Sequence, residues 1–316
     1  MRRTLALVML VLFSLSWLAA CGAPQRETVT LRVGLLPILD ALPFYVAQEE
    51  GYFAAEGVEV EFVPVASAAE RDQLLMAGQV DVVIDDLVSL LLLDREGVQV
   101  VAVRTAMRPT ETFAQFRILA SAQSGIEGVE GLRGVPIGIS EGTIIEYLTE
   151  QLLERAGLEP EEIETVAVPR IPDRMALLES GELEAAMLPE PLASLAVAKG
   201  ARVVLDDRAF PDLSCSLVSV RAEVLEAHPQ AVQAMLAALE QAVAAINADK
   251  GRWDALLAEK HLLPPSLAGS FALPDYPAAS VPSAACFEAV QQWVETKGLL
   301  SSAPAYEAVV RGDLLP

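Results

Sequence analysis

The sequence contains a pattern that recurs 103 residues further along the chain. Arg71-x-x-Leu74-Leu75-x-x-Gly78-x-Val80-Asp81-x-x-Ile84 matches Arg174-x-x-Leu177-Leu178-x-x-Gly181-x-Leu183-Glu184-x-x-Met187. Each copy reads as a helix that ends at a glycine and is followed by an apolar strand. The repeat predicts two similar α/β lobes, for which a chain of 316 residues is long enough.

A β-α-β unit precedes the first copy and runs from Leu31 to Val65. Its first strand is the apolar run 31–36, a short helix follows Pro43, and its second strand spans 58–63. The second copy has a matching unit, with a strand at 135–140, a helix at 143–156 and a strand at 163–168. Strands that alternate with helices in this way predict a parallel sheet covered on both faces.

Two stretches are expected to carry the chain between the lobes. The first lies at 104–119, where Arg108-Pro109-Thr110 interrupts a strand, and the second lies at 206–220, where Arg208 to Pro211 does the same. Two such crossings predict a hinge that permits closure of the lobes and restricts other motions. From Val224 onward the sequence is predicted to be mostly helical.

The N-terminus has the features of an export signal. Two arginines precede an apolar segment at 5–20, which is shorter than the roughly 20 residues of a membrane span. The segment ends in Leu18-Ala19-Ala20-Cys21-Gly22, which resembles a lipobox. We therefore expect a lipoprotein signal peptide at 1–20, lipidation of Cys21 and a tether at 21–28. The alternative is an ordinary cleavage site with a chance cysteine.

The charge of the chain excludes some partners. With 44 acidic and 22 basic residues, the formal net charge is −22, which disfavours binding to nucleic acid or to an anionic membrane surface. A soluble, acidic surface is the simpler interpretation, and the membrane is expected to be reached through the lipid anchor only. Cys215 and Cys286 could pair in an oxidising compartment or remain buried thiols, and two cysteines define no disulfide framework.

The opening unit resembles a known family. The turn Leu36-Pro37 to Asp40, then Phe44-Tyr45-Val46-Ala47-Gln48-Glu49, Gly51-Tyr52-Phe53 and Glu56-Gly57-Val58-Glu59-Val60 resemble the solute-binding proteins of ABC importers. The similar branch binds nitrate, alkanesulfonates, taurine, thiamine-type pyrimidines and other vitamins. The resemblance covers about 29–311 and implies the type 2 periplasmic-binding-protein fold, α/β with two Rossmann-like lobes joined by a two-strand hinge. Because the family returns its helical tail to the first lobe, lobe 1 is expected at 29–112 and 214–316, and lobe 2 at 113–213.

Ligands of open α/β sheets bind beyond the carboxyl ends of the strands, which locates a candidate site. Each of these residues alone could be a helix cap or a solvated charge. Residues near the start of a helix could instead hold a ligand oxygen, and the family resemblance favours ligand binding at Thr143, Asp86 and Glu190. The candidate ligand-binding residues are Asp40, Phe44, Asp85, Asp86, Ser140, Glu141, Gly142, Thr143 and Glu190.

The candidate site is acidic, which bears on its ligand. Carboxylates buried beside an anion need compensating cations, and the nearby candidates are Arg104, Arg108 and Arg170. A neutral or cationic solute with N–H and O–H donors fits better. Aromatic rings that could stack on a heterocycle are Phe44, Tyr45, Phe113, Phe116 and Tyr147. Among the ligands that the resemblance implies, riboflavin is the first choice; alkanesulfonates, taurine, nitrate and a thiamine-pyrimidine precursor are the alternatives.

Some proteins of this fold are biosynthetic enzymes, so catalysis is the alternative class of function. The two histidines, His228 and His261, fall in the predicted helical tail, and the sequence has no G-x-S-x-G motif, P-loop or metal-ligand cluster. We therefore expect a monomeric binding protein without catalytic residues, cofactor or metal. The resemblance implies delivery of the solute to a permease whose ATPase is a separate chain, with the binding protein on the extracytoplasmic face of the cell membrane.

Overall fold

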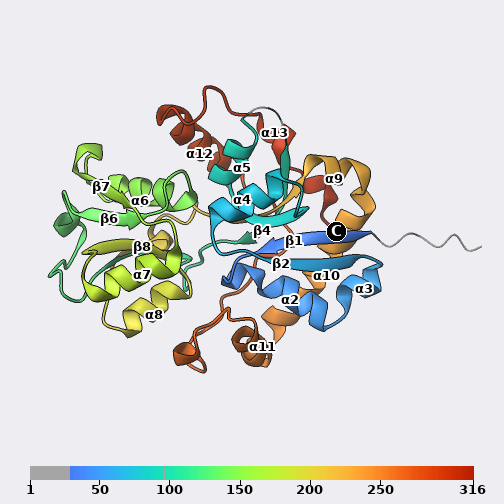
Figure 1. Cartoon of the computed structure of the whole chain (residues 1–316), viewed down its shortest axis with the longest axis horizontal. Coiled ribbons are helices and arrows are strands. Elements are labelled where there is room, and N and C mark those ends of the chain that lie inside the picture. The colour runs from blue at the N-terminus through green and yellow to red at the C-terminus, as the bar shows by residue number, and fades with distance from the viewer. Residues whose placement is uncertain (1–28, 96, 98) are drawn as a thin grey trace, which may run out of the picture.

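The computed structural model describes residues 29–95, 97 and 99–316. The chain forms two five-stranded sheets with helices on the faces of each (Figure 1). We call the first sheet with its helices lobe 1 and the second sheet with its helices lobe 2. The predicted signal peptide, the tether and Cys21 lie outside the described residues. We propose the lobe boundaries 112/113 and 213/214, which fall in the connections between the two sheets.

The sheet of lobe 1 has the strand order β2-β1-β3-β10-β4. Its apolar strands β1 and β3 lie side by side in parallel, with Val33 opposite Val82. β10 runs antiparallel to both of its neighbours. The strands are β1 (Thr30–Leu35), β2 (Glu59–Pro64), β3 (Val82–Asp86), β4 (Val100–Met107) and β10 (Ser216–Arg221).

The sheet of lobe 2 repeats this plan in the order β7-β6-β8-β5-β9. β6 pairs with β8 in parallel, with Ile137 opposite Ala185, and β5 runs antiparallel to β8 and β9. The predicted repeat is therefore confirmed at the level of sheet topology. The strands are β5 (Phe116–Ala120), β6 (Pro136–Ile139), β7 (Glu164–Ala167), β8 (Ala185–Pro189) and β9 (Arg202–Asp206).

The prediction of a parallel sheet is wrong for one strand in each lobe. β5 follows the first crossing and β10 follows the second, so each enters its sheet from the opposite lobe. The parallel strands β3 and β8 end at the edge where the lobes meet, because Phe116 pairs with Pro189 and Ser216 with Asp86. A strand that begins at this edge must run against strands that end there.

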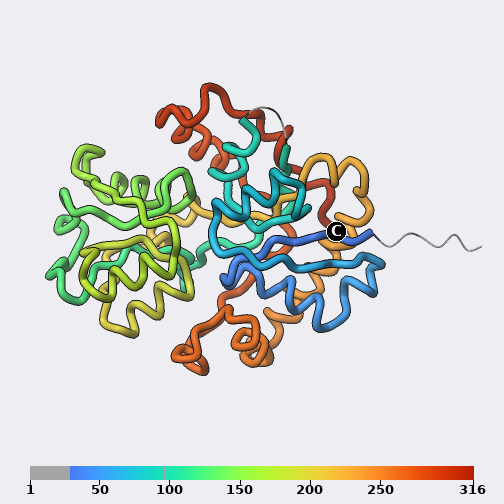
Figure 2. Tube along the Cα trace, viewed as in Figure 1, coloured from blue at the N-terminus to red at the C-terminus, as the bar shows by residue number. Residues whose placement is uncertain are grey.

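Helices cover both faces of each sheet (Figures 1 and 2). In lobe 1, α2, α3 and α10 pack together on one face, and α4, α5 and α12 belong to the core on the other. In lobe 2, α6 lies on one face, and α7 and α8 pack on the other. The helices are α2 (Leu42–Glu49), α3 (Tyr52–Glu56), α4 (Ala68–Met76), α5 (Leu87–Leu93), α6 (Ile144–Arg155), α7 (Ile171–Ser180), α8 (Leu192–Ala198), α9 (Ala222–Ala227), α10 (Pro229–Ala248), α11 (Asp254–Glu259), α12 (Ala284–Thr296) and α13 (Tyr306–Val309).

Short 3-10 turns complete the structure. The turn η1 links β1 to α2, and η4 lies in the second crossing between β9 and β10. The others lie in loops or flank the tail helices. The turns are η1 (Leu39–Ala41), η2 (Val129–Leu132), η3 (Pro160–Glu162), η4 (Asp207–Ala209), η5 (Lys250–Trp253), η6 (Pro265–Leu267) and η7 (Gly312–Leu314).

Two helices of the tail have distinct roles in the fold. α10 is long and apolar enough to span a membrane by length and composition, and it is the one such helix in the described part of the chain. Its apolar face packs against α2 and α3, which accounts for its composition. α12 contacts α5 of lobe 1 and also reaches α6 of lobe 2, where Trp293 Nε1 donates to Glu150 at 2.8 Å. Lys297, just after α12, lies 2.6 Å from the carboxylate of Glu150 and 3.0 Å from that of Glu146.

Candidate ligand cavity between the lobes

A cavity of ≈ 100 Å³ lies between the lobes, at the carboxyl ends of β1, β3, β6 and β8. A water molecule needs roughly 10–15 Å³ of such space, so the cavity can hold a group of several heavy atoms. Most of its lining is apolar, with Phe113 and Phe116 from the first crossing and Ile145 from α6. Its polar lining comes from both lobes.

Six of the candidate residues line this cavity, and their role in binding stays a prediction. Asp40 follows β1, Asp85 and Asp86 end β3, Ser140 and Thr143 lie between β6 and α6, and Glu190 follows β8. These are the positions that the rule of strand carboxyl ends indicates.

The other three candidates lie elsewhere. Phe44 is 1% exposed on the inner face of α2, where its ring meets Phe62 edge-on, so it belongs to the core of lobe 1. Glu141 is exposed to solvent. Gly142 lies outside the cavity lining, and its N–H donates to the carboxylate of Glu146 at 2.7 Å. Of the aromatic candidates, Phe113 and Phe116 line the cavity, whereas Tyr45 packs on Phe62 and Tyr147 packs on Trp293.

The lobe 1 wall carries three buried carboxyl groups. Asp40 accepts hydrogen bonds from the Ser216 hydroxyl and, at 3.1 Å, from Gln115 Nε2. Asp85 Oδ1 accepts from Ser219 Oγ at 2.6 Å, whereas its Oδ2 has no hydrogen-bond partner among the described residues. Asp86 caps α5 by accepting from the Ser89 N–H at 2.9 Å. Burial raises the pKa of all three carboxyl groups, and that of Asp85 most clearly.

Arg71 is a functional candidate that the site prediction missed. It extends from α4 to the cavity, where its guanidinium donates to the Ile84 carbonyl at 3.1 Å and to Ser89 Oγ at 2.6 Å. A third bond, at 2.8 Å, goes to Asp72. Arg71 therefore holds the end of β3 and the start of α5 in place beside Asp85 and Asp86.

Arg174 occupies the corresponding position in lobe 2. It is wholly buried on α7, and its Nη1 donates to Ser140 Oγ at 2.8 Å and to the Val168 carbonyl at 2.9 Å. Its Nε and Nη2 have no acceptor, and no carboxylate among the described residues pairs with it. Burial without a counter-charge lowers the pKa of Arg174 to about 10. Ser140 thus separates the cavity from an unpaired buried cation.

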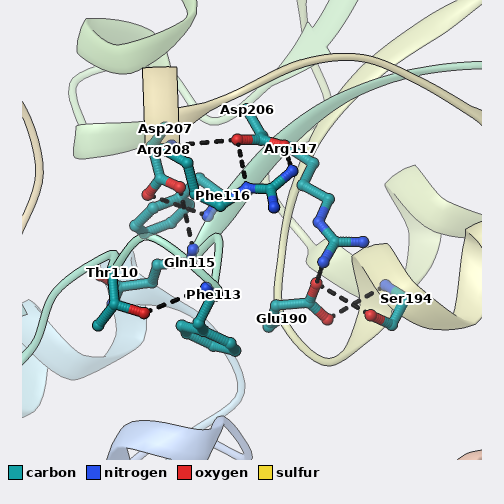
Figure 3. Close-up of polar contacts among 10 residues, drawn as sticks. All are labelled: Thr110, Phe113, Gln115, Phe116, Arg117, Glu190, Ser194, Asp206, Asp207 and Arg208. Atoms are coloured by element: carbon teal, nitrogen blue, oxygen red, sulfur yellow. Dashed lines mark hydrogen bonds and ion pairs between the residues drawn. The ribbon is translucent and has the colours of Figure 1, made fainter. Parts of the chain in front are cut away.

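Glu190 is neutralised within lobe 2. Its carboxylate lies 2.8 Å from the Arg117 guanidinium and accepts from Ser194 Oγ at 3.0 Å, as Figure 3 shows. Burial raises the pKa of Glu190, and the nearby Arg117 charge opposes that rise. The pair therefore adds little net charge to the cavity.

These contacts correct the expected set of cations. Arg104 turns to Glu240 and the Pro277 carbonyl, Arg170 is exposed beside Asp173, and Arg108 is exposed as well. None of the three lines the cavity. Instead the structure brings Arg71, Arg117 and Arg174 to its walls or just behind them. An anionic ligand would therefore find cations near this cavity. The repeat, which aligns Arg71 with Arg174, is the sequence signal for two of these arginines.

The two chain crossings are tied to each other beside the cavity (Figure 3). Asp207 on η4 accepts from the N–H groups of Gln115 and Phe116 at 3.0 and 3.2 Å, and from Ser214 Oγ at 3.0 Å. The side chain is fully buried, and burial raises the pKa of Asp207 to about 7. A single carboxyl group thus joins both connections of the predicted hinge.

No group of three or more His, Cys, Asp and Glu side chains in the described ranges is arranged to hold a metal ion. Cys215, which lines the cavity, and Cys286 on α12 are buried free thiols.

A family model describes most of the chain. The model of the NMT1-like family matches residues 24–258. The chain belongs to the NMT1-like family. Its two-sheet architecture agrees with solved structures of the type 2 periplasmic-binding-protein fold, as expected. The periplasmic aliphatic sulphonate binding protein SsuA from Escherichia coli superimposes with a TM-score of 0.74 at 20% identity, over 89% of this chain and 92% of that one.

Two curated relatives of this NMT1-like chain match over shorter stretches. The bicarbonate-binding protein CmpA of Synechococcus elongatus is 38% identical over 60 residues, which make up 19% of this chain and 13% of CmpA. The riboflavin-binding protein RibY of Chloroflexus aurantiacus is 33% identical over 123 residues, 37% of this chain and 32% of RibY. The alignments thus span a minor part of each of these two relatives.

Proposed function

We propose that the chain is the solute-binding protein of an ABC importer. The observation that carries the proposal is the cavity enclosed between two similar lobes that are joined by two crossings. Lobes connected in this way can close on a solute, which gains affinity as water is excluded and hydrogen bonds are completed. The binding-protein names of the relatives support the same function. The partners would be a permease and its separate ATPase chain, and lipidation of Cys21 would hold the protein on the extracytoplasmic face of the cell membrane.

Binding is proposed in preference to catalysis. Covalent or acid–base catalysis needs a nucleophile or base held in reach of a substrate. No histidine is among the residues that line the described cavity, and His228 and His261 lie in the tail. The Cys215 thiol lines the cavity, but its hydrogen bond with Cys286 and its burial raise its pKa, which disfavours the nucleophilic thiolate. The carboxyl groups of the cavity are held by serine, glutamine, arginine and backbone partners, as suits a wall that binds.

Riboflavin remains our first candidate for the solute, on the similarity to RibY and on the two phenylalanines at the cavity. Pyrimidine precursors of thiamine, alkanesulfonates, taurine and nitrate are the alternatives. The cavity is small for riboflavin in this arrangement, so a riboflavin complex would need the lobes further apart. The anions among these alternatives are retained because Arg71 lies at the cavity wall and Arg174 lies behind it.

Thermal unfolding of the full-length protein in detergent tests the proposal. The panel is riboflavin, thiamine, hydroxymethylpyrimidine, taurine, an alkanesulfonate and nitrate. A ligand at one hundred times its dissociation constant should add about 2.7 kcal/mol to the free energy of unfolding, a readily measured shift. Glu190→Gln should weaken that shift, and Glu141→Gln, at an exposed neighbour of the cavity, serves as the control. If no member of the panel shifts the transition and no small molecule is retained from cell extract, the proposed function is wrong.

A further inference from the structure

The two walls of the cavity differ in the polar atoms that they leave without partners. Among the described residues, the acceptors without a partner on the lobe 1 side are Asp85 Oδ2 and Oε1 of Gln115. Gln115 belongs to the first crossing, and its amide nitrogen holds it against lobe 1 through bonds to Asp40 and Ser216. The side chains of Asp85 and Gln115 line the cavity and are no more than 4% exposed. Buried acceptors without a donor are costly, so this wall favours a solute that brings N–H or O–H groups.

The ionisable groups of lobe 1 also favour a solute that brings hydrogen-bond donors. Among the described residues of lobe 1, three carboxyl groups line the cavity, from Asp40, Asp85 and Asp86, against one guanidinium, that of Arg71. Arg71 already donates to Asp72, Ser89 and the Ile84 carbonyl. The lobe 1 wall therefore keeps an excess of carboxyl groups over guanidinium groups, which favours a solute with hydrogen-bond donors or a positive charge.

Lobe 2 has the opposite character. Arg174 is fully buried behind Ser140 with two nitrogens unbonded and with no carboxylate partner in the described part of the chain. The N-terminus of the 12-residue helix α6 faces the same space, with Thr143 and Ile144 in the cavity lining. Backbone N–H groups at a helix start and a buried guanidinium both favour negative charge nearby. Two carboxylates lie nearby, and each is paired with a cation of its own: Glu190 with Arg117, and Glu146, in the first turn of α6, with Lys297.

We propose that the solute is two-ended, with hydrogen-bond donors or a positive charge held by the acidic wall of lobe 1 and an oxygen acceptor or negative charge held at the start of α6 over Arg174. The inference rests on the proposed function and specifies its class of ligand. The middle of the solute is apolar or flat, since Phe113, Phe116 and Ile145 line the space between the walls. A simple anion would leave the acceptors of lobe 1 unbonded, and a simple cation would leave Arg174 uncompensated.

Three small probes with the same ring test the inference on the full-length protein in detergent. They are 4-(aminomethyl)benzoate, which has both ends, benzylamine, which has the positive end, and benzoate, which has the negative end. Their dissociation constants are measured by isothermal titration calorimetry. We expect 4-(aminomethyl)benzoate to bind at least about 10-fold more tightly than either one-ended probe, because it engages both walls at once.

Two variants test which wall holds the positive end of the probe and which holds the negative end. Arg174→Met should remove the advantage of 4-(aminomethyl)benzoate over benzylamine while benzylamine itself binds as before, and Asp85→Asn should remove its advantage over benzoate. Arg170→Met is the matched control, because Arg170 immediately precedes α7 but is exposed and pairs with Asp173. It should bind all three probes as the unmodified protein does.

Specific outcomes would overturn the inference. One is a two-ended probe that binds no more tightly than the better one-ended probe in the unmodified protein, a comparison that needs no variant to fold. Another is an Arg174→Met protein that binds all three probes unchanged. If the probes fail while nitrate or another one-ended solute of the panel binds, the ligand class is wrong and the proposed function stands. If neither the probes nor the panel bind, both proposals fail.

Discussion

At the scale of single residues, Arg174 can be buried because Gly138 leaves room for it. A Cβ built on Gly138 of β6 would lie 2.7 Å from Leu183 Cδ1 and 3.2 Å from Arg174 Cγ. Contacts this short require the neighbours to move, and both neighbours are in the core of lobe 2. Gly34 on β1 is the corresponding glycine of lobe 1, and its nearest neighbour would be Val83 Cγ1 at 3.4 Å.

Gly138→Ala is expected to destabilise the protein by about 1–3 kcal/mol, the usual cost of forcing an extra methyl group into a packed core. Gly34→Ala is the matched control and should cost clearly less, because its methyl group meets ordinary van der Waals contacts. Urea unfolding of both full-length variants measures the difference. Equal losses would mean that the space at Gly138 is not what holds the arginine in place.

At the scale of elements, Asp207 connects the two crossings. Its ionisation should therefore change the stability of the folded protein. Its pKa in the folded protein is raised to about 7, above the ordinary value of 3.8. Between these values the folded state holds a proton that the unfolded state has lost. Stability from this group is therefore present below about pH 4 and is lost as the pH rises through about 7.

Asp207→Asn should flatten the pH dependence of stability between about pH 4 and 7. The difference between the two proteins should change with pH by at most about 4 kcal/mol, since each pKa unit corresponds to about 1.4 kcal/mol. The variant should also be less stable than the parent at low pH, because Gln115 and Phe116 donate to different carboxyl oxygens and the amide nitrogen that replaces one of them cannot accept. Chemical unfolding at several pH values measures both effects, with exposed Asp173→Asn as control. A pH profile parallel to that of the parent would contradict the role given to Asp207.

At the scale of the whole molecule, α12 spans the two lobes and holds them near each other. Trp293 bonds Glu150 and packs edge-on against Tyr147 with ring centroids 5.5 Å apart, and Lys297 pairs with two glutamates of α6. All of these contacts join the tail to lobe 2. Because they exist only while the lobes are close, they should favour the closed arrangement over an open one.

Trp293→Phe combined with Lys297→Met should shift the unliganded protein toward open forms. Partly exposed ion pairs contribute about 0.2–1 kcal/mol each, so the shift should be moderate. Small-angle X-ray scattering should show a larger radius of gyration. If the proposed function holds, the solute should also bind more weakly, because the competent state is less populated. Lys199→Met removes a pair with Glu179 inside lobe 2 and is the control. A variant as compact as the parent would show that α12 does not act as a closure contact.

Periodicity and the repeat were sufficient to predict the two α/β lobes, the helix and strand types, and the strand ends that line the cavity. Phe44 is near the end of β1 in sequence, but α2 directs its ring into the core of lobe 1, a direction that the sequence pattern did not reveal. Arg174 was missed because its long side chain reaches Ser140, 34 positions away in sequence. The antiparallel β10 was missed because its direction depends on where the chain returns from lobe 2, which local pattern does not encode.

The late position of β10 also sets an order of assembly. All strands of the second sheet lie within 116–206, whereas the first sheet needs residues 216–221 between β3 and β4. During synthesis, which begins at the N-terminus, all strands of the second sheet are therefore made before the last strand of the first sheet. Until then β3 and β4 each present an unpaired apolar edge, the kind of surface that recruits other chains. The interval between the synthesis of residue 107 and that of residue 221 should therefore control how strongly the nascent chain aggregates.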